Sequence, residues 1–167
     1  MTRADELHDA FDRGFAAPLR PPESAHSDFL CIQIGSEPLA LQLTDIASLH
    51  ADLRIVALPT RAPELLGMAA IRAAIVPIYD LGVTLGLPPA VAVRWLVVAR
   101  GGTAGFAFER FDGHTRLLDR ATALATIGGH VRGQLTVDGQ PRSIVDLGSV
   151  VAAIETRWRP RGAAKEP

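Results

Sequence analysis

The sequence contains very little cysteine, and its histidines are scattered. Cys31 is the single cysteine among 167 residues, so the chain cannot form an internal disulfide. The 5 histidines never approach one another at the spacing of metal ligands. The segment Met1–Glu6 carries acids where a secretory signal would carry a basic region. These absences predict a cytoplasmic protein without a metal or another cofactor.

Aromatic residues, excess charge and long apolar runs are scarce as well. Aromatics make up 5% of the chain, and 17 basic residues stand against 18 acidic ones, so no nucleic-acid-binding surface is predicted. The longest apolar stretch, residues 81–93, is broken by glycines and prolines and is shorter than the roughly 18 residues of a membrane helix. The length and a hydrophobic fraction of 48% indicate one folded domain, or two very small ones that share a core.

Residues 1–27 have the composition of a tail and linker. Leu7, Phe11 and Phe15 recur every four residues, which predicts a short amphipathic helix, and prolines follow it. Burial of three such side chains yields roughly 1.5–3 kcal/mol each, whereas ordering the backbone costs about 1–2 kcal/mol per residue. The candidate helix therefore needs a surface, which is either its own domain or a partner protein.

From residue 28 the sequence reads as short strands separated by turn residues, which predicts a mainly β, barrel-type domain. Three hairpins are expected, from the strands 29–34 and 39–43, 95–99 and 105–108, and 131–137 and 142–145. The run 74–79 is a further strand, and its Pro77 predicts an edge or a bulge. Residues 46–49 are expected as a short helix or turn, 54–58 as a strand, and 149–156 as a terminal helix.

The pattern strand, Asp-Leu-Gly, helix occurs twice, at Asp80 and at Asp146. Two similar half-domains would explain the repeat. A pair of carboxylates could also serve as a general acid and base. Helix capping accounts for both aspartates in their local context without catalysis, and we favour it.

No other segment predicts catalysis. Gly101–Gly105 resembles a phosphate-binding loop in composition, but a β-type run follows it instead of a helix, so a hairpin turn is predicted. Cys31 lies within a strand with nothing nearby in sequence to stabilise its thiolate, which favours a small core residue over a nucleophile.

The segment Leu65–Leu81, LLGMAAIRAAIVPIYDL, resembles the signature of the CheW-like domain, the coupling module of bacterial chemosensory systems. The family carries a glycine, then Asn-Leu-Arg-Gly, then an apolar strand with Pro-x-x-Asp-Leu. The opening hairpin, the proline-bounded loop at 57–63, the strand Gly105–Phe111 and the late Ile144–Leu147 follow in family order, so the resemblance covers about residues 28–155.

The resemblance implies two small SH3-like β-barrels that share a hydrophobic seam, with short helices and a C-terminal helix. It implies non-catalytic coupling: the family binds the cytoplasmic tip of chemoreceptors in the groove between the barrels, and the regulatory domain of a CheA-type histidine kinase at a barrel end. A membrane is then reached only through the receptors. The implied domain is residues 28–156, followed by a basic tail at 157–167. The implied partner-binding positions are Arg72, Ile46, Ser48, Leu49, Gly67, Leu96 and Phe111.

Arg72 also stands out without the resemblance, because it is the only charge between Glu64 and Asp80. Such a side chain snorkels to water, pairs with an acid or presents its guanidinium to a partner. The family often carries a glutamate near residues 46–49 that can pair with this arginine, whereas this chain has Ser48 there. Three functions therefore stay open: a receptor–kinase adaptor, a divergent CheW-like protein of another sensory pathway or of array modulation, and a small-ligand-binding barrel.

Overall fold

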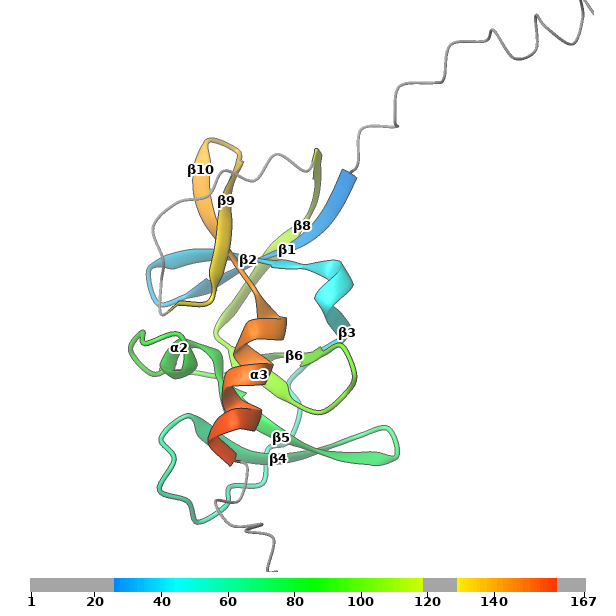
Figure 1. Cartoon of the computed structure of the whole chain (residues 1–167), viewed down its shortest axis with the longest axis vertical. Coiled ribbons are helices and arrows are strands. Elements are labelled where there is room, and N and C mark those ends of the chain that lie inside the picture. The colour runs from blue at the N-terminus through cyan, green and yellow to red at the C-terminus, as the bar shows by residue number, and fades with distance from the viewer. Residues whose placement is uncertain (1–25, 119–128, 159–167) are drawn as a thin grey trace, which may run out of the picture.

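The computed structural model describes residues 26–118 and 129–158, and these residues form ten strands and three helical segments (Figure 1). The first half contains β1 (His26–Ile34), β2 (Glu37–Gln42), η1 (Leu43–Asp45), β3 (Ile46–Ala51), β4 (Leu65–Ile71), β5 (Ala74–Asp80) and α2 (Leu81–Thr84). The second contains β6 (Trp95–Ala99), β7 (Gly105–Phe108), β8 (Arg110–Leu118), β9 (Val131–Val137), β10 (Gln140–Val145) and α3 (Leu147–Trp158).

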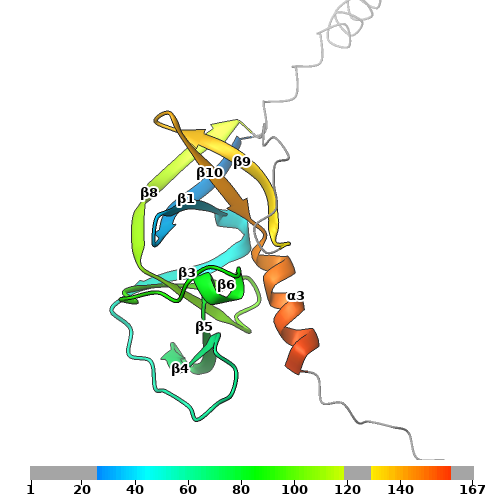
Figure 2. The same cartoon turned by 90° about the vertical axis from the view of Figure 1, so that its left-hand side faces the viewer.

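The strands form two five-stranded sheets, which confirms the mainly β fold class. Sheet A has the order β8-β1-β2-β10-β9, and sheet B has the order β3-β6-β7-β5-β4. Figure 2 shows sheet A curling around its own interior above sheet B, with α3 running from one sheet to the other. Sheet B is built from one continuous part of the chain, whereas sheet A combines the first two strands with the last three.

The two sheets repeat one pattern of pairing. In each sheet an antiparallel hairpin, β1–β2 or β6–β7, pairs in parallel with the second strand of another hairpin, β10 or β5. A helix follows that second strand in both halves, and an aspartate begins it. Asp80 Oδ1 accepts from Val83 N at 3.1 Å, and Asp146 Oδ1 accepts from Ser149 N at 3.0 Å. Both aspartates are thus helix caps, as expected.

The main core lies between the sheets and corresponds to the expected hydrophobic seam. It takes side chains from the inward faces of both sheets and from α3, whose Val150 and Ile154 are buried in it. Because these two residues are four apart, they lie on one face of the helix. Two smaller hydrophobic clusters pack within the individual sheets. One includes Val76 and Val98 of sheet B, and the other includes Phe29 and Ile144 of sheet A. Cys31 is buried, as predicted for a core residue.

Two local expectations were wrong. Residues 46–49 belong to β3 rather than to a helix, because their backbone groups pair with β6. Residues 54–58 contain only one bridge residue, Val56, which exchanges two backbone hydrogen bonds with Met68 of β4, at 2.8 and 2.9 Å. A strand needs several consecutive pairs, and this segment has a single one.

Pro77 shows why β5 tolerates a proline although it is an inner strand of sheet B. Met68 lies opposite Pro77, and the backbone groups of Met68 point away from β5, toward Val56. The missing N–H of Pro77 therefore faces the other side, where the pairing of β5 with β7 begins only at Ile78. The expectation of an edge strand was therefore wrong, because β5 lies between β7 and β4, and Pro77 fits since the pairing with β7 starts one residue later.

The candidate helix at Leu7, Phe11 and Phe15 lies outside the described residues. Within the described ranges, none of the helices has the length and hydrophobicity needed to cross a membrane. β1 begins at His26 and α3 continues to Trp158, so both extend slightly beyond the predicted domain limits.

Candidate functional site

The site is built on the hairpin of β4 and β5, whose turn consists of Arg72 and Ala73. Ile71 pairs with Ala74, so only two residues connect the strands, and Arg72 adopts a φ of 56°. This left-handed conformation is unfavourable for a residue other than glycine, asparagine or aspartate. The tight turn holds the Arg72 side chain at the very end of the hairpin, so its position is fixed by the backbone.

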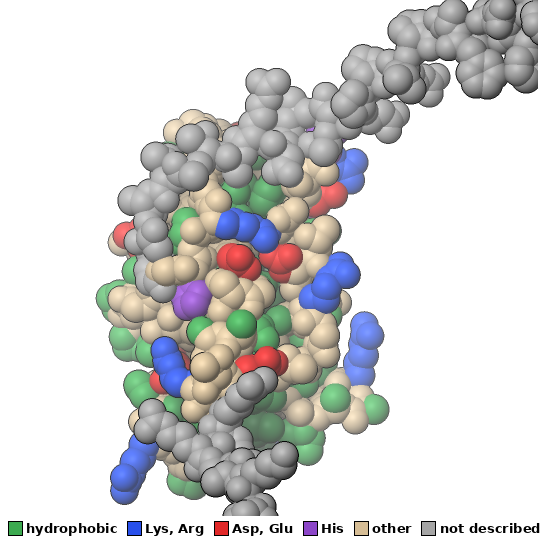
Figure 3. Space-filling view, viewed as in Figure 1, with side chains coloured by type: hydrophobic (Ala, Val, Ile, Leu, Met, Phe, Trp, Pro, Cys, Tyr) green, Lys and Arg blue, Asp and Glu red, His purple; other side chains and the backbone are tan. Residues whose placement is uncertain are grey.

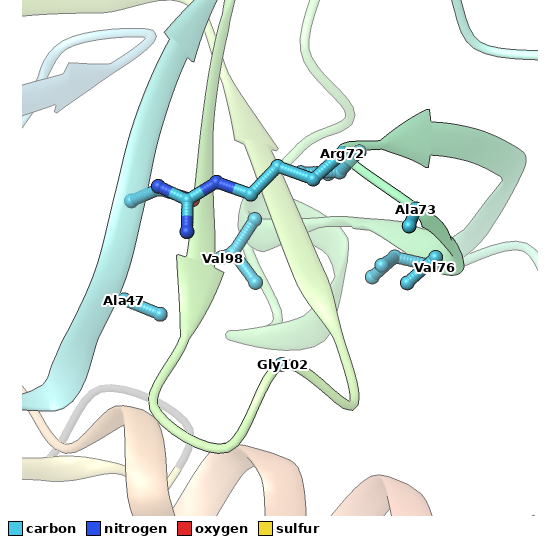
Figure 4. A pocket seen from close by; sticks show the side chains of 9 residues that line it. Ala47, Arg72, Ala73, Val76, Val98 and Gly102 are labelled. Atoms are coloured by element: carbon cyan, nitrogen blue, oxygen red, sulfur yellow. The ribbon is translucent and has the colours of Figure 1, made fainter.

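Beneath the turn lies a pocket of about 310 Å³ between the hairpin, β3 and the turn of β6 and β7. Ile71, Val76 and Val98 supply apolar side chains, and Ala47, Ser48, Ala73, Ala74 and Gly102 complete the lining. Figure 4 shows the Arg72 side chain crossing above Val98 toward β3, so the guanidinium lies at the rim of an apolar cavity. Such a pocket suits an apolar side chain that is accompanied by an anionic group.

The electrostatics of the site depend on Arg72, whose guanidinium has no ion-pair partner in the part of the chain that the structure describes. Among the described residues, no carboxylate lies within ion-pair distance of its guanidinium, although six other arginines each pair with an aspartate or a glutamate. Ser48 replaces the acid expected at this place, and its Oγ lies 2.9 Å from His50 Nε2. The guanidinium is exposed to solvent and keeps its hydrogen-bonding capacity for a second molecule.

Comparisons with known proteins agree with the family resemblance that was seen in the sequence. The family model of the CheW-like domain matches residues 28–155. The chain belongs to the CheW-like domain family. The crystal structure of the scaffolding protein TtCheW from Thermoanaerobacter tengcongensis is similar, with a TM-score of 0.63 and 16% identity over 72% of this chain and 89% of that chain. At this identity the likeness concerns the fold. A comparison with curated proteins gives no match.

The CheW-like fold brings only two of the expected site residues, Arg72 and Ser48, together at the pocket. Leu96 is 2% exposed and lies in the core of sheet B, and Ile46 and Leu49 pack against the main core. Phe111 also packs there, with its ring centroid 5.2 Å from that of Trp95. These residues support the two sheets and do not line the pocket.

Gly67 allows the segment at Val56 to pack closely against β4 of the hairpin. Its φ is 149°, and a Cβ atom built on it would lie 2.1 Å from the carbonyl oxygen of Val56. Only glycine therefore lets Val56 and Ala57 approach the edge of β4 and form the Val56 bridge. Gly67 is buried and thus positions the hairpin through the backbone.

A second surface, which sequence reasoning missed, lies on the opposite face of the same hairpin. This outer hairpin face consists of Val56, Met68, Ala70, Ile75 and Pro77, as the register of β4, β5 and the Val56 bridge requires. Ile75 is 73% exposed and Val56 is 56% exposed. The alternation of Ile75 with buried Val76 was a signal, but β5 reads as uniformly apolar, so the sequence alone did not identify the outward face.

The described residues contain no cluster of three or more His, Cys, Asp or Glu side chains that could bind a metal ion. His130, Ser149 and Asp146 are close to one another, with 2.8 Å between His130 Nδ1 and Ser149 Oγ. Ser149 Oγ, however, donates to the backbone oxygen of Asp146, and the Asp146 carboxylate accepts from Ser149 N. This arrangement caps α3 and lacks the carboxylate–histidine contact of a catalytic triad.

Proposed function

We propose that this protein is a non-catalytic, cytoplasmic adaptor that couples chemoreceptors to a CheA-type histidine kinase. The observation that carries the proposal is the exposed Arg72 guanidinium at the rim of an apolar pocket, in a chain of the CheW-like domain family. An adaptor acts through surfaces alone, so the proposal needs neither a cofactor nor a catalytic group.

The Arg72 pocket is the proposed contact for the receptor tip. A helix that inserts an apolar side chain against Val76 and Val98, and places a carboxylate one turn away, would satisfy both parts of the pocket. A charge-assisted hydrogen bond at Arg72 contributes about 1.5–3 kcal/mol when it is shielded from water. The pocket thus favours an acidic helix over a neutral one.

The outer hairpin face is the proposed contact for the regulatory domain of the kinase. Its exposed Ile75 and Val56 side chains gain roughly 1.5–3 kcal/mol each when an apolar partner covers them. Because the two faces belong to one rigid hairpin, a shift of the receptor helix in the pocket would be transmitted to the kinase side. Coupling through geometry alone then becomes feasible.

A second candidate is a divergent CheW-like protein that serves another sensory pathway or modulates an array. One observation favours it: the place of the family's glutamate is taken by Ser48, whose hydroxyl contacts His50. In that case the partner of Arg72 would be an acidic helix of a different receptor. Both candidates use the same surfaces, so binding partners distinguish them.

The proposal is tested by calorimetric titration of the full-length protein with receptor-tip fragments and kinase regulatory domains from the same cell. Arg72→Ala should weaken receptor binding at least tenfold, as loss of about 1.4 kcal/mol implies. Arg116→Ala is the control, because Arg116 is an exposed arginine of sheet A that pairs with Asp28. If neither partner binds, or if Arg72→Ala binds every receptor as the wild type does, the adaptor proposal is wrong.

A further inference from the structure

A second groove lies between the two sheets, apart from the Arg72 pocket. We call it the inter-sheet groove. It has a volume of about 350 Å³ and is lined by the β1–β2 turn from Ile34 to Glu37, by Leu87, Pro88, Pro89 and Val91 of the loop before β6, and by Glu109. Among the described residues, five apolar side chains and two carboxylates form its lining, and no cation does.

Glu109 gives the groove its shape. Its Oε2 accepts from Gly35 N at 2.9 Å, and its Oε1 accepts from Val91 N at 2.7 Å. Asp80 Oδ2 accepts from Ala90 N at 3.0 Å, so two carboxylates hold the backbone of this loop. The loop is therefore fixed, yet the Val91 side chain at its edge is 96% exposed. The Val91 side chain is therefore held in solvent and does not pack in the core.

The repeat in the fold contains an equivalent pocket, which α3 borders on one side. Glu109 directly precedes β8, and Asp45 directly precedes β3, its counterpart in sheet B. Arg100 N donates to the backbone oxygen of Asp45 at 2.7 Å, whereas Gly35 N donates to the side-chain carboxylate of Glu109. Next to Asp45 and Arg100 lies α3, with Val151 against that groove and Val150 and Ile154 buried beneath.

The half of the fold that contains α2 has no helix as long as α3 among its described residues. α2 has 4 residues against the 12 of α3, and Gly86, Pro88 and Pro89 follow it, so the chain cannot continue as a helix. In the inter-sheet groove, the loop with Leu87, Pro88, Pro89 and Val91 forms the wall that α3 forms in the equivalent pocket.

We propose that the chain's own N-terminal segment, residues 3–15, docks in the inter-sheet groove as an amphipathic helix. Leu7, Phe11 and Phe15 supply apolar side chains at a spacing of four, which places them on one helix face. Arg3 extends the same stripe by one turn, and the groove offers the exposed carboxylate of Glu37. The apolar stripe matches the apolar lining and Arg3 can pair with Glu37, whereas the four acids of the segment lie on its other faces.

The chain is long enough for this contact. The groove begins at Ile34, the last residue of β1, and the 9 residues of β1 span about 26–30 Å. Residues 16–25 connect the candidate helix to β1, and they reach about 31 Å as a polyproline-type chain and about 35 Å when fully extended. The linker can therefore run back along β1 to the groove. Because the connection is covalent, the effective concentration of the segment is in the millimolar range.

A spin label on the full-length protein tests the proposal. The substitution Asp12→Cys places a nitroxide on the polar side of the candidate helix, and buried Cys31 stays unlabelled. We expect the amide signals of Gly35, Ser36 and Leu87 to lose intensity relative to the reduced label, and the signals of Ser48 and Gly102 at the Arg72 pocket to keep theirs. The loss should be the same after tenfold dilution.

Two further substitutions make the test specific. Val91→Asp should abolish the intensity loss, because it places a charge at the edge of the groove. Ile75→Asp is its matched control, as another exposed aliphatic residue outside the groove, and should leave the loss unchanged. Intensity loss elsewhere, no loss, or a loss that vanishes on dilution would overturn the proposal. Receptor and kinase binding is measured separately, so this result leaves the adaptor proposal unaffected.

Discussion

Arg157, in the last turn of α3, forms an ion pair with Glu64, with 2.9 Å between Arg157 Nη1 and Glu64 Oε1. The Glu64 side chain is 8% exposed, and its backbone oxygen accepts from Asp80 N at 2.8 Å. The pair ties the end of α3 to the segment just before β4. Figure 3 shows acidic and basic side chains scattered over this face in small groups, among apolar and uncharged surface.

Arg157→Ala should therefore destabilise the fold although Arg157 itself is exposed. The substitution leaves a buried carboxylate without its charged partner, which costs about 1–3 kcal/mol. Urea unfolding followed by circular dichroism measures the change. Arg94→Ala is the control, because Arg94 and Asp52 form an ion pair with both side chains exposed, and it should change the free energy of unfolding by less than about 1 kcal/mol. Equal effects of the two variants would contradict this assignment.

Arg72→Gly should separate stability from binding. Glycine adopts the left-handed φ of the turn without strain, and this gain is offset by its greater freedom in the unfolded chain, so the free energy of unfolding should change by less than about 1 kcal/mol. Receptor binding should weaken as it does in Arg72→Ala. A glycine variant that unfolds early would show that Arg72 has a structural role that the described contacts do not reveal.

Gly67→Ala should act through the backbone. The added Cβ meets the Val56 carbonyl at 2.1 Å, so the segment at Val56 must leave the edge of β4, at a cost of about 1–3 kcal/mol or more. Gly139→Ala is the comparison: its φ is also positive, but its Cβ meets nothing within 4 Å. Hydrogen exchange at Val56 and Met68 should rise only in the first variant.

The stability should depend on Asp112 at acidic pH. Burial raises the pKa of this carboxyl, but hydrogen bonds from Arg142 and Arg110 outweigh burial and hold the pKa below its usual value. A lowered pKa in the folded state stabilises the protein above the unfolded-state pKa of about 3.9, and this contribution is lost as the pH falls through the folded-state value. In urea titrations, the stability advantage of the wild type over Asp112→Asn should shrink from about pH 5 downward. A constant difference would contradict the prediction.

Cys31 should be inert in the folded protein. Burial raises the pKa of its thiol, and the nearby Arg142 opposes this only in part. Because the thiolate is the reactive form, a thiol reagent should label Cys31 at neutral pH only after the chain is unfolded. Rapid labelling of the native protein would show that β1 opens locally.

The sequence predicted the fold class and three hairpins because turn residues and alternation are local signals. It failed at β3, because the apolar spacing of Ile46 and Leu49 fits a helix and the pairing with β6 is remote in sequence. Arg72 could be selected from its isolated charge, but its two-residue turn could not, since Arg-Ala lacks the glycine or asparagine that predicts such turns. The role of Glu109 could not be predicted, because its two backbone partners, Gly35 and Val91, come from loops that are distant in sequence.

In the sequence, all strands of sheet B lie between β2 and β8 of sheet A, and this affects the order in which the sheets fold. Ser27 pairs with Leu117 and Leu39 pairs with Ser143, so sheet A closes only after the whole of sheet B has been brought between its parts. Long loops make such closure entropically slow, and we expect sheet B to be structured in the rate-limiting transition state. Core substitutions in sheet B should then slow folding, and those in β9 and β10 should mainly speed unfolding. During synthesis, β1 and β2 would leave the ribosome early, and β2 would remain without β10 until Val145 is made.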